Sequence, residues 1–497
     1  MAVCARSAVL RGVDATPIEV EVDLLRRLPG VCIVGLAQGA VREAAERVRS
    51  AIQASGLEFP RKRVVVNLAP ADVRKEGTAF DLPMAVGVLS ADGQVPAEAL
   101  ERTLLVGELS LGGELRPVRG AVALALLARS RGWQLVLPAS SAGQAALVPE
   151  VAVYGATDLA SVVAHLTGER PLPRATPAPA EAVAEEVDLA DVRGQAVARR
   201  ALEIAAAGGH HLLLWGPPGC GKSMLARRLP GILPPLRFEE ALEVTRVHSA
   251  AGLPVAERGL VRHRPFRAPH HSITVAGMVG DRTLRPGEVS LAHHGVLFLD
   301  EATELSRPAI EVLRGPLEDG RIQLTRAEGS VVYPAAVSLV LAANPCPCGM
   351  RGSEHPCACG DAEVARYRRR LSGPILDRVD LHVDLEAVPA EVLVGGPAGE
   401  PSAAVRERVL AARRRQAQRG QLVTNARLEG AELARRAPLT PEATALLHQA
   451  IRRLGLSGRA ATRVTRVART LADLDAAPRI TEAHLAEAVG FRPREAA

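Results

Sequence analysis

Aromatic side chains and long apolar runs are both scarce in this sequence of 497 residues, of which only 2% are aromatic. This scarcity argues against a nucleic-acid surface built from stacked rings, so that any such contact would fall mainly on phosphates. No stretch approaches the roughly 18 apolar residues that a membrane-spanning helix needs, and the N-terminus lacks the apolar segment of an export signal. We therefore expect a soluble, cytoplasmic protein without a membrane partner.

Lysine is also nearly absent, since only Lys62, Lys75 and Lys222 interrupt an otherwise arginine-based set of 61 basic residues. The net charge of +6 is mild, but residues 403–470 contain 15 arginines against four glutamates. This uneven distribution favours contact with phosphates in the C-terminal part of the chain.

Four of the seven cysteines, Cys346, Cys348, Cys357 and Cys359, fall within one short segment, which excludes a dispersed disulfide framework. Two close pairs of thiols around a glycine-containing loop can form the closed tetrahedral site of structural zinc, although C-x-x-C pairs are the commoner spacing. The alternatives are a reduced loop without metal, or a site in which His355 replaces one thiolate.

The length predicts about three domains. The clearest break is the Pro-, Ala- and Glu-rich stretch 167–187, which is typical of a semi-stiff linker. It separates a mixed α/β domain at 1–166 from an α/β core at 188–400, whose short apolar runs indicate buried parallel strands. From 401 to 497, Ala, Leu and Arg at helical spacing predict a bundle of helices.

The segment GPPGCGKS at 216–223 fits the phosphate-binding pattern G-x-x-x-x-G-K-[ST] and lies between an apolar run and a helical stretch, as that pattern requires. Its glycines let backbone N–H groups wrap phosphates, Lys222 supplies a charge to the β and γ phosphates, and Ser223 offers a hydroxyl to Mg²⁺. The predicted nucleotide-binding residues are Gly216, Pro217, Pro218, Gly219, Cys220, Gly221, Lys222 and Ser223.

Two later apolar runs supply acidic and amide groups that fit the same site. GVLFLDE delivers Asp300 to the end of a predicted strand, where it can hold the Mg²⁺ shell, and Glu301 can orient and polarise the attacking water. VSLVLAANP ends in Asn344, which could orient the same water, although Asn before Pro is also an ordinary turn. The sequence therefore predicts an ATP-hydrolysing site.

Arg378 stands between Asp377 and Asp380 after the turn SGP. An exposed arginine held by neighbouring carboxylates can reach the γ-phosphate of an adjacent subunit, an effect worth about 10³–10⁵ in kcat where it occurs. A plain surface salt bridge is the alternative.

Six motifs follow one another along nearly the whole chain: GPPGCGKS, FRAPHH, RPGEVSLAHHGVLFLDE, LAANPCPCG, RLSGPILDRVDLHV and LSGRAATRVTRVARTLADL. In this order they resemble the magnesium-chelatase-like branch of the AAA+ ATPases, and most closely its ComM/YifB family. The resemblance implies a P-loop AAA+ core with a C-terminal helical lid. It also implies the Walker A, Walker B, sensor 1 and arginine-finger roles for Lys222 and Ser223, for Asp300 and Glu301, for Asn344, and for Arg378, respectively.

Further roles are implied by the same resemblance. Val192 and Gln195 would lie near the adenine, and sensor 2 would be Arg459, with Arg466 as the alternative. Since an arginine finger in trans needs a neighbour, we expect a homo-hexameric ring that binds ATP and Mg²⁺ at each subunit boundary.

Two segments resemble the parts of related motors that face a central pore. The region from about 248 to 289 is similar to the helix-2 insertion of that clade, and GRIQLTRAEGSVVYP at 320–334 is similar to its pre-sensor hairpin. Arg321 and Arg326 could there touch a phosphate backbone, while solvated hairpin charges are the alternative.

The N-terminal domain resembles the proteolytic domain of Lon through KEGTAFDLPMA at 75–85 and VGELSLGGELRPVRGAVALALLARSRGWQLVLP at 106–138. The positions of the Lon serine and lysine fall on Ala79 and Val122, which can neither attack a carbonyl nor accept a proton. Neighbouring Thr78 has no lysine to activate it. We expect a Lon-protease-like fold whose peptidase activity is lost.

Three functions compete on these observations. The basic C-terminal part, the arginine-bearing hairpin and the resemblance favour a helicase that drives branch migration of single-stranded or branched DNA during natural transformation and recombination. The rival is a remodelling or chelatase-type ATPase that acts on a protein partner, although chelatase motor subunits lack the Lon-like domain. An ATP-dependent protease is opposed by Ala79 and Val122.

Overall fold

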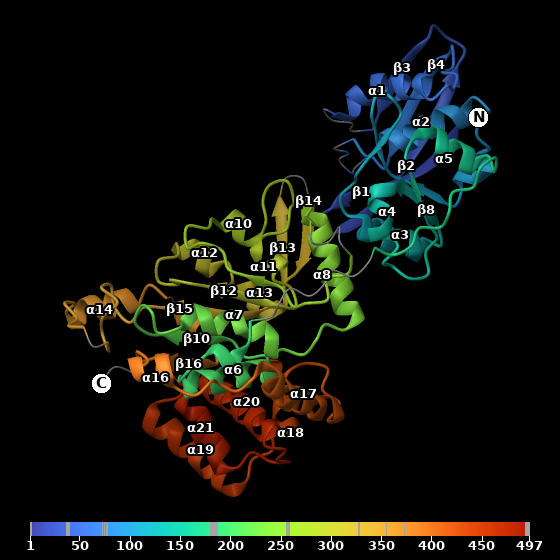
Figure 1. The fold of residues 1–497 in the computed structure, drawn as a ribbon. Helices are drawn as coiled ribbons and strands as arrows, with labels where there is room; N and C mark the ends of the chain where they lie inside the picture. Colours follow the sequence, from blue (N-terminus) through green and yellow to red (C-terminus); the bar gives the residue numbers. More distant parts are fainter. Residues whose placement is uncertain are drawn as a thin grey trace.

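The computed structural model describes residues 2–35, 40–71, 73, 75, 78–178, 187–254, 259–326, 329–353, 355–371 and 373–492. The N-terminal lobe lies at one end of the molecule, the phosphate-loop core lies in the middle, and the C-terminal helices lie at the other end (Figure 1). In the part of the chain described here, no helix is long and apolar enough to cross a membrane. The predicted class, mixed α/β followed by a helical lid, is confirmed.

The N-terminal lobe is built on a seven-stranded mixed sheet. Its strands are β1 (Val3–Arg11), β2 (Asp14–Leu25), β3 (Gly30–Val34), β4 (Arg63–Ala69), β5 (Thr103–Leu105), β8 (Gln134–Pro138) and β9 (Val153–Ala156), in the spatial order β3-β4-β2-β1-β5-β8-β9. A separate two-stranded ribbon is formed by β6 (Glu108–Leu109) and β7 (Leu115–Arg116).

Five helices pack on this sheet: α1 (Ala40–Ala54), α2 (Asp81–Ala91), α3 (Ala121–Arg131), α4 (Ala139–Ala145) and α5 (Leu159–Leu166). α2 is apolar on all sides and is buried from Asp81 to Ser90. The Asp81 carboxylate at its start accepts hydrogen bonds of 2.9 and 3.0 Å from the Arg47 guanidinium, which compensates the buried charge.

The core holds a five-stranded parallel sheet. The strands are β10 (Leu212–Trp215), β11 (Phe266–Arg267), β12 (Val296–Leu299), β15 (Ser338–Ala343) and β16 (Leu381–Asp384), in the spatial order β11-β12-β15-β10-β16. The apolar runs that predicted β10, β12 and β15 are almost fully buried, as strands covered on both faces must be.

Short helices surround this sheet, and one hairpin projects from it. The helices are α6 (Ala196–Gly208), α7 (Lys222–Ile232), α8 (Phe238–Ala251), α10 (Val275–Val279), α11 (Glu288–Leu291), α12 (Arg307–Glu311), α13 (Arg314–Asp319), α14 (Asp361–Arg368), α15 (Gly373–Leu376) and α16 (Ala390–Gly395). The predicted hairpin is confirmed as β13 (Arg321–Arg326) paired antiparallel with β14 (Gly329–Pro334).

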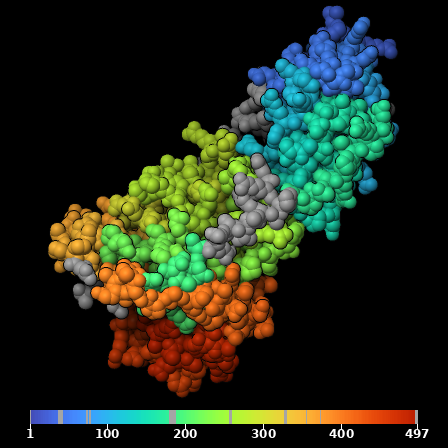
Figure 2. Space-filling view, viewed as in Figure 1, coloured from blue at the N-terminus to red at the C-terminus, as the bar shows by residue number. Residues whose placement is uncertain are grey.

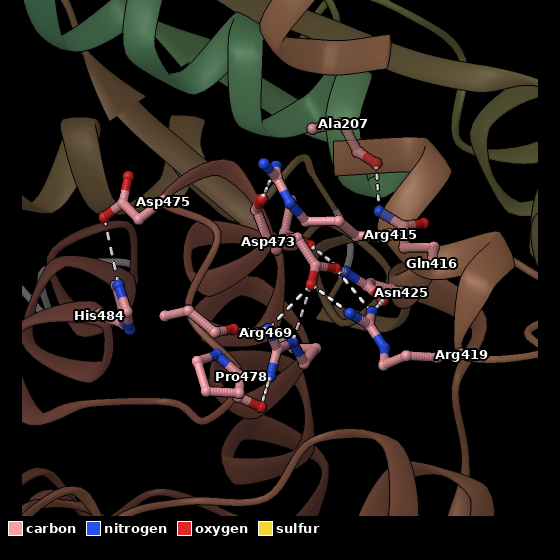
Figure 3. A network of polar contacts seen from close by, with 12 residues as sticks. Ala207, Arg415, Gln416, Arg419, Asn425, Arg469, Asp473, Asp475, Pro478 and His484 are labelled. Carbon is pink, nitrogen blue, oxygen red and sulfur yellow. Dashed lines mark hydrogen bonds and ion pairs between the residues drawn. The ribbon is translucent and has the colours of Figure 1, made fainter. Parts of the chain in front are cut away.

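The lid consists of α17 (Ser402–Gln418), α18 (Gly430–Arg436), α19 (Pro441–Leu454), α20 (Gly458–Leu474) and α21 (Glu482–Gly490). A buried carboxylate, Asp473, joins α20 to the end of α17 (Figure 3). It accepts hydrogen bonds from Arg469 at 2.8 Å, from Arg419 at 2.7 Å and from Asn425 at 2.8 Å. Removing any one donor would leave a buried charge incompletely compensated.

Several arginines of the lid bond groups inside the protein, so the number of arginines overstates the charge that is free to contact phosphates. Arg413 donates to the Ala206 carbonyl at 2.8 Å, and Arg415 donates to the Asp473 carbonyl at 2.7 Å. Arg463 is buried as well and donates to the Leu376 carbonyl. Composition alone could not distinguish these internal arginines from solvent-facing ones.

The N-terminal lobe rests on α8 and on the hairpin, and Figure 2 shows it joined to the rest of the molecule at one end. Arg246 of α8 donates to Asp14 at 2.8 Å, and Ser249 donates to Gln144 at 2.6 Å. Val13, in the turn between β1 and β2, is buried in the same apolar cluster as Tyr333 of β14. The N-terminal lobe therefore touches the hairpin directly.

The first part of the predicted linker lies against the N-terminal sheet. The N–H of Ala175 donates to the Val153 carbonyl at 2.8 Å, and that of Ala178 donates to the Gly143 carbonyl at 2.9 Å. Residues 179–186 of the linker lie outside the described part. The domain boundaries at 166, 187 and 400 stay predictions.

Candidate nucleotide-binding site

Three neighbouring parallel strands deliver the predicted nucleotide-site residues to one edge of the core sheet. β10 is followed by the loop 216–221, β15 by Asn344, and β12 by Asp300. Because parallel strands have their carboxyl ends at the same edge, groups more than 120 residues apart in the chain meet there.

The loop between β10 and α7 has the backbone of an anion cradle. Gly219 and Gly221 adopt φ values of +81° and +94°, a region that residues with a side chain rarely enter. α7 then begins at Lys222, so its free N–H groups and dipole face the loop.

Lys222 bridges the loop and the neighbouring strand. Its Nζ donates to the carbonyls of Gly216 at 2.6 Å and Pro217 at 2.9 Å, and to Asn344 Oδ1 at 3.2 Å. Desolvation lowers the pKa of this half-enclosed amine. A phosphate group would offer the ammonium the opposite charge that these neutral acceptors lack.

Ser223 and Asp300 form a second contact in the same cluster. The Ser223 hydroxyl donates to Asp300 Oδ2 at 2.7 Å, while Asp300 Oδ1 accepts the backbone N–H of Glu301 at 2.9 Å. A hydroxyl beside a carboxylate matches the oxygen donors that Mg²⁺ prefers. The donor set fits Mg²⁺ with a nucleotide phosphate.

Glu301 has a partner that the sequence did not reveal. Its Oε2 lies 2.7 Å from Nδ1 of His271, a residue of the FRAPHH segment. The paired histidines were the only available signal, and they could not indicate which carboxylate would face them. Glu301 therefore lies beside the cluster while its carboxylate contacts the segment after β11.

A cleft of about 570 Å³ adjoins the loop and brings in the residues that were expected near the adenine. Val192 and Gln195 line it together with Gly219, Cys220 and Gly221. The Gln195 amide donates to the Cys220 carbonyl at 3.1 Å, which ties this entry segment to the loop. The cleft is open and has room for a base and ribose next to the phosphate cradle.

Arg378 differs from its prediction in exposure and in partner. Its side chain is only 16% exposed and pairs with Glu318 at the end of α13, not with Asp377 or Asp380. Asp377 instead accepts from Arg463 at 3.3 Å, and Asp380 pairs with His210 at 2.8 Å. The flanking acids were the wrong partners because tertiary packing turns them toward the lid and β10.

Comparison with known proteins identifies the chain. The model described as "Magnesium chelatase, subunit ChlI" matches residues 188–393, and two further models of this subunit match 20–141 and 399–492. YifB of Escherichia coli is 45% identical over 483 residues, which cover 97% of this chain and 95% of YifB. Competence protein ComM of Haemophilus influenzae is 43% identical over 492 residues, which cover 97% of this chain and 95% of ComM. The chain belongs to the ComM/YifB family.

This family is part of the magnesium-chelatase-like AAA+ ATPases, so its membership implies ATP and Mg²⁺ as cofactors and an oligomeric assembly. A shorter match falls on the Holliday junction branch migration complex subunit RuvB of Synechococcus sp.. It is 35% identical over 159 residues, which cover 30% of this chain and 34% of RuvB.

The two arginines predicted for sensor 2 have different surroundings in this family member. Arg459 lies exposed in the first turn of α20. Arg466, two turns later, donates to the Leu428 carbonyl at 2.6 Å and pairs with Glu429 at 3.1 Å. Arg459 is thus the one whose guanidinium faces solvent, and its role stays a prediction.

The remaining predicted residues lie away from the cluster. Arg321 is exposed at the base of the hairpin opposite Pro334. Arg326 ends β13 opposite Gly329, and its side chain lies outside the described part. The four cysteines of the loop 346–359 converge, whereas His355 is not part of their group.

Glu243, His293 and His294 form a second cluster of side chains that could bind a metal ion. A histidine ligand needs an unprotonated ring nitrogen facing the metal, and His293 does not offer one here. His293 Nδ1 accepts the backbone N–H of Ala336 at 3.0 Å, so the neutral ring carries its proton on Nε2. That Nε2 lies 3.0 Å from Glu243 Oε2 and donates to it. The ring nitrogen facing the cluster is therefore a donor, not a ligand.

Proposed function

We propose that this protein is an ATP-driven DNA motor that forms a hexameric ring in the cytoplasm and promotes branch migration in natural transformation and homologous recombination. The observation that supports the DNA part is the 43% identity to a competence protein over nearly the full length of both chains. The partial match to a branch migration subunit supports the same direction.

The polar cluster supplies the groups that ATP hydrolysis requires. In the proposed reaction, Lys222 binds the β and γ phosphates, Ser223 and Asp300 hold the Mg²⁺ shell, and Asn344 orients the attacking water. Glu301 accepts the proton of that water as it attacks the γ-phosphorus, and the bond to the bridging oxygen breaks to release ADP and phosphate.

The proposed ring is inferred from the arginine finger, Arg378, which would act on a neighbouring subunit. Arg378 is held by Glu318 within its own chain, and a guanidinium can exchange a carboxylate for phosphate oxygens, which match its fork equally well. In the proposed assembly this exchange occurs with the nucleotide of the neighbouring subunit. A hexamer is the closed ring that we expect.

The hairpin is the proposed DNA contact. Arg321 is exposed at its base and Arg326 ends the strand at its tip. Aromatic side chains are scarce, and several lid arginines bond groups inside the protein. The proposal that this protein binds DNA therefore rests more on Arg321 and Arg326 than on the arginines of the lid. Contacts to phosphates would give binding that depends steeply on salt and weakly on sequence.

ATP turnover with single-stranded, duplex and forked DNA tests the proposal, together with a salt series of DNA binding. Replacing both Arg321 and Arg326 by Ala should lower the log–log salt slope by about 1–2, since each phosphate contact contributes about 0.7–0.9. Gln323→Ala, an exposed uncharged position on the same strand, is the matched control and should leave the slope unchanged.

Three outcomes separate the alternatives. Equal slopes for wild type and the double variant would remove the hairpin from the DNA path. Failure of the wild type to bind DNA at low salt with ATP would sink the motor proposal. ATP turnover that responds to none of the DNAs would favour the rival, a remodelling ATPase acting on a protein partner.

A further inference from the structure

The four-cysteine loop at 346–359 brings its thiols together as free cysteines. Cys346 Sγ lies 3.4 Å from Cys348 Sγ and 3.6 Å from Cys357 Sγ, and the last two are 3.6 Å apart. All four sulfurs, including that of Cys359, lie within 4.8 Å of one another. Four sulfurs bound at about 2.3 Å to one tetrahedral Zn²⁺ lie about 3.8 Å apart, so the spacing is that of a closed zinc site.

The surroundings suit thiolate ligands. The backbone N–H of Arg351 points at Cys346 Sγ with a nitrogen–sulfur distance of 3.4 Å, as outer contacts to metal-bound sulfur do. Cys346 is buried and the other three are wholly or partly exposed, so a metal ion could enter from the solvent side. The chemistry is that of Zn²⁺ because four soft ligands in tetrahedral geometry select it over Mg²⁺ or Ca²⁺.

The loop also touches the phosphate-binding loop. A Cβ placed on Gly349 would lie 3.0 Å from both Cγ and Cδ of Pro218, which is closer than such atoms normally approach. Asn344, which bonds Lys222, lies only two residues before Cys346. The fold of the cysteine loop is therefore continuous with two sides of the candidate nucleotide site.

We propose that Cys346, Cys348, Cys357 and Cys359 bind one structural Zn²⁺, and that this metal holds Gly349 against Pro218 and thereby fixes the phosphate-binding loop. Binding of the metal releases the thiol protons, since thiolates are the ligands. The metal site stands independently of the DNA proposal, whereas its effect on nucleotide binding rests on the proposed ATP site.

The metal content of the protein tests whether the four cysteines bind zinc. Elemental analysis of the full-length protein, purified under reducing conditions and dialysed extensively, should give one zinc per chain. Cys346→Ser and Cys359→Ser should lose the metal, while Cys4→Ser and Cys32→Ser, which change thiols of the N-terminal lobe, should retain it. Substoichiometric zinc in fresh wild-type protein, or retention by the loop variants, would overturn the site.

Two glycines of the cysteine loop form a matched pair that tests whether this loop supports the phosphate-binding loop. Gly349 and Gly352 share a φ of +79°, but a Cβ at Gly352 would meet nothing within 4 Å. Gly349→Ala should therefore bind a non-hydrolysable ATP analogue about tenfold more weakly than Gly352→Ala, which corresponds to about 1.4 kcal/mol. Both should keep their zinc, and the backbone strain is common to both. Equal affinities would overturn the support of Pro218 by the loop, and wild-type protein that binds no analogue would instead refute the ATP site.

A second inference rests on a different contact, that between His271 and Glu301. β11 runs parallel to β12 with Arg267 opposite Leu297, so the chain leaving β11 passes the end of β12 where Glu301 lies. An ion pair of 2.6 Å between Arg267 and Glu288 anchors that segment. The contact to Glu301 is thus made by a residue within the predicted insertion at about 248–289.

The contact holds the predicted water-activating carboxylate outside the polar cluster. Lys222 bonds Asn344, and Ser223 bonds Asp300, whereas the partner of the Glu301 carboxylate within the described chain is His271. Glu301 has a φ of +47°, which few residues with a side chain adopt.

We infer that His271 is a positioning residue that restrains Glu301 from the attacking water until the insertion shifts, so that the insertion and ATP turnover are coupled. This inference rests on the proposed role of Glu301 in hydrolysis. It gives the FRAPHH segment a function that needs no bound metal.

Steady-state ATP hydrolysis by the full chain tests the restraint. His271→Ala should raise kcat without DNA about fivefold, as expected for loss of a hydrogen bond worth about 1 kcal/mol, with KM for ATP unchanged. His271→Asn, which can still donate to Glu301, should stay near wild type. His270→Ala is the neighbouring control, since His270 contacts Ser272.

A kcat that falls or stays unchanged in His271→Ala would overturn the restraint. The test does not depend on DNA: if the wild type is not stimulated by DNA, the motor proposal fails while the basal rates still decide the role of His271.

Discussion

Two regions of this molecule have the framework of a reactive site, and they differ in the side chains at the positions where chemistry was predicted. Beside the phosphate-binding loop a cleft of about 570 Å³ adjoins the cluster of Lys222, Ser223, Asp300 and Asn344. Between the N-terminal lobe and residues 282–285 of the core, a cleft of about 550 Å³ adjoins Ala79. The two clefts are almost equal in size, so volume does not distinguish a chemical site from an inert one.

The difference lies in what packs at the centre. Val122 is fully buried in an apolar cluster against which Ala79 packs, so the two positions that the resemblance to Lon assigns to a dyad lie in one cluster. Neither side chain can donate or accept a proton. The backbone framework and the chemistry can therefore be separated, because the sheet and helices are held by apolar burial that the loss of two functional groups does not disturb.

Lys222→Ala should have the largest effect, because it removes a reactive group from the core and so makes its site resemble the apolar one at Ala79 and Val122. ATP turnover should be abolished, because the β and γ phosphates lose their main protein cation. Lys62→Ala is the matched control, since Lys62 is exposed in the N-terminal lobe and pairs with Asp92. Nucleotide binding and phosphate release measure both, and residual turnover in Lys222→Ala would contradict the assignment.

Arg378→Ala should lower kcat about 10³-fold or more while each subunit still binds ATP, because the finger acts on the neighbour's phosphate. Mixing this variant with Lys222→Ala protein should partly restore hydrolysis, since some boundaries then pair an intact loop with an intact finger. Mixed rings are verified by mass. Absence of recovery in verified mixed rings would argue against action in trans.

Glu301→Gln should lower kcat about 10²-fold or more and leave ATP binding intact, because only proton acceptance from the water is lost. The variant should also accumulate assembled rings with ATP, which light scattering can detect. The Glu301→Gln protein should differ from the Lys222→Ala protein because it should still bind ATP. Turnover at the wild-type rate would show that another group activates the water.

The sequence was sufficient for the parts of the core whose information is local. The phosphate-binding loop could be found because glycines, lysine and serine follow in one stretch between a strand and a helix. The strands β10, β12 and β15 could be found because fully buried parallel strands are continuously apolar. The hairpin at 320–334 was predicted from its resemblance to the pre-sensor hairpin of related motors.

Pairings across the fold could not be predicted. Glu318 precedes Arg378 by 60 residues, and His271 precedes Glu301 by 30, so only the tertiary arrangement brings each pair together. The lid shows the same limit in its charges, because Arg413 and Arg463 are used to bond backbone carbonyls inside the protein. Composition reports the number of arginines and not the direction in which they point.

Thr78→Ala should have the smallest effect. It tests whether the N-terminal lobe has any catalytic group beside Ala79. Thr78 donates its hydroxyl hydrogen to Glu108, an arrangement near Ala79 that could mimic a nucleophile with a base. Arg116 lies 3.3 Å from the same carboxylate in a largely exposed ion pair, and no lysine of the described residues contacts the Thr78 hydroxyl.

The wild type and Thr78→Ala should therefore both fail to hydrolyse fluorescent casein with or without ATP, and should hydrolyse ATP at equal rates. Ala79→Ser is the companion variant: it restores a hydroxyl at the Lon-like position but leaves Val122 without an amine, so it should be equally inactive on casein. Casein hydrolysis that Thr78→Ala abolishes would mean that a carboxylate can replace the missing lysine. In that case the apolar packing of Ala79 and Val122 would no longer be a reason to exclude a protease.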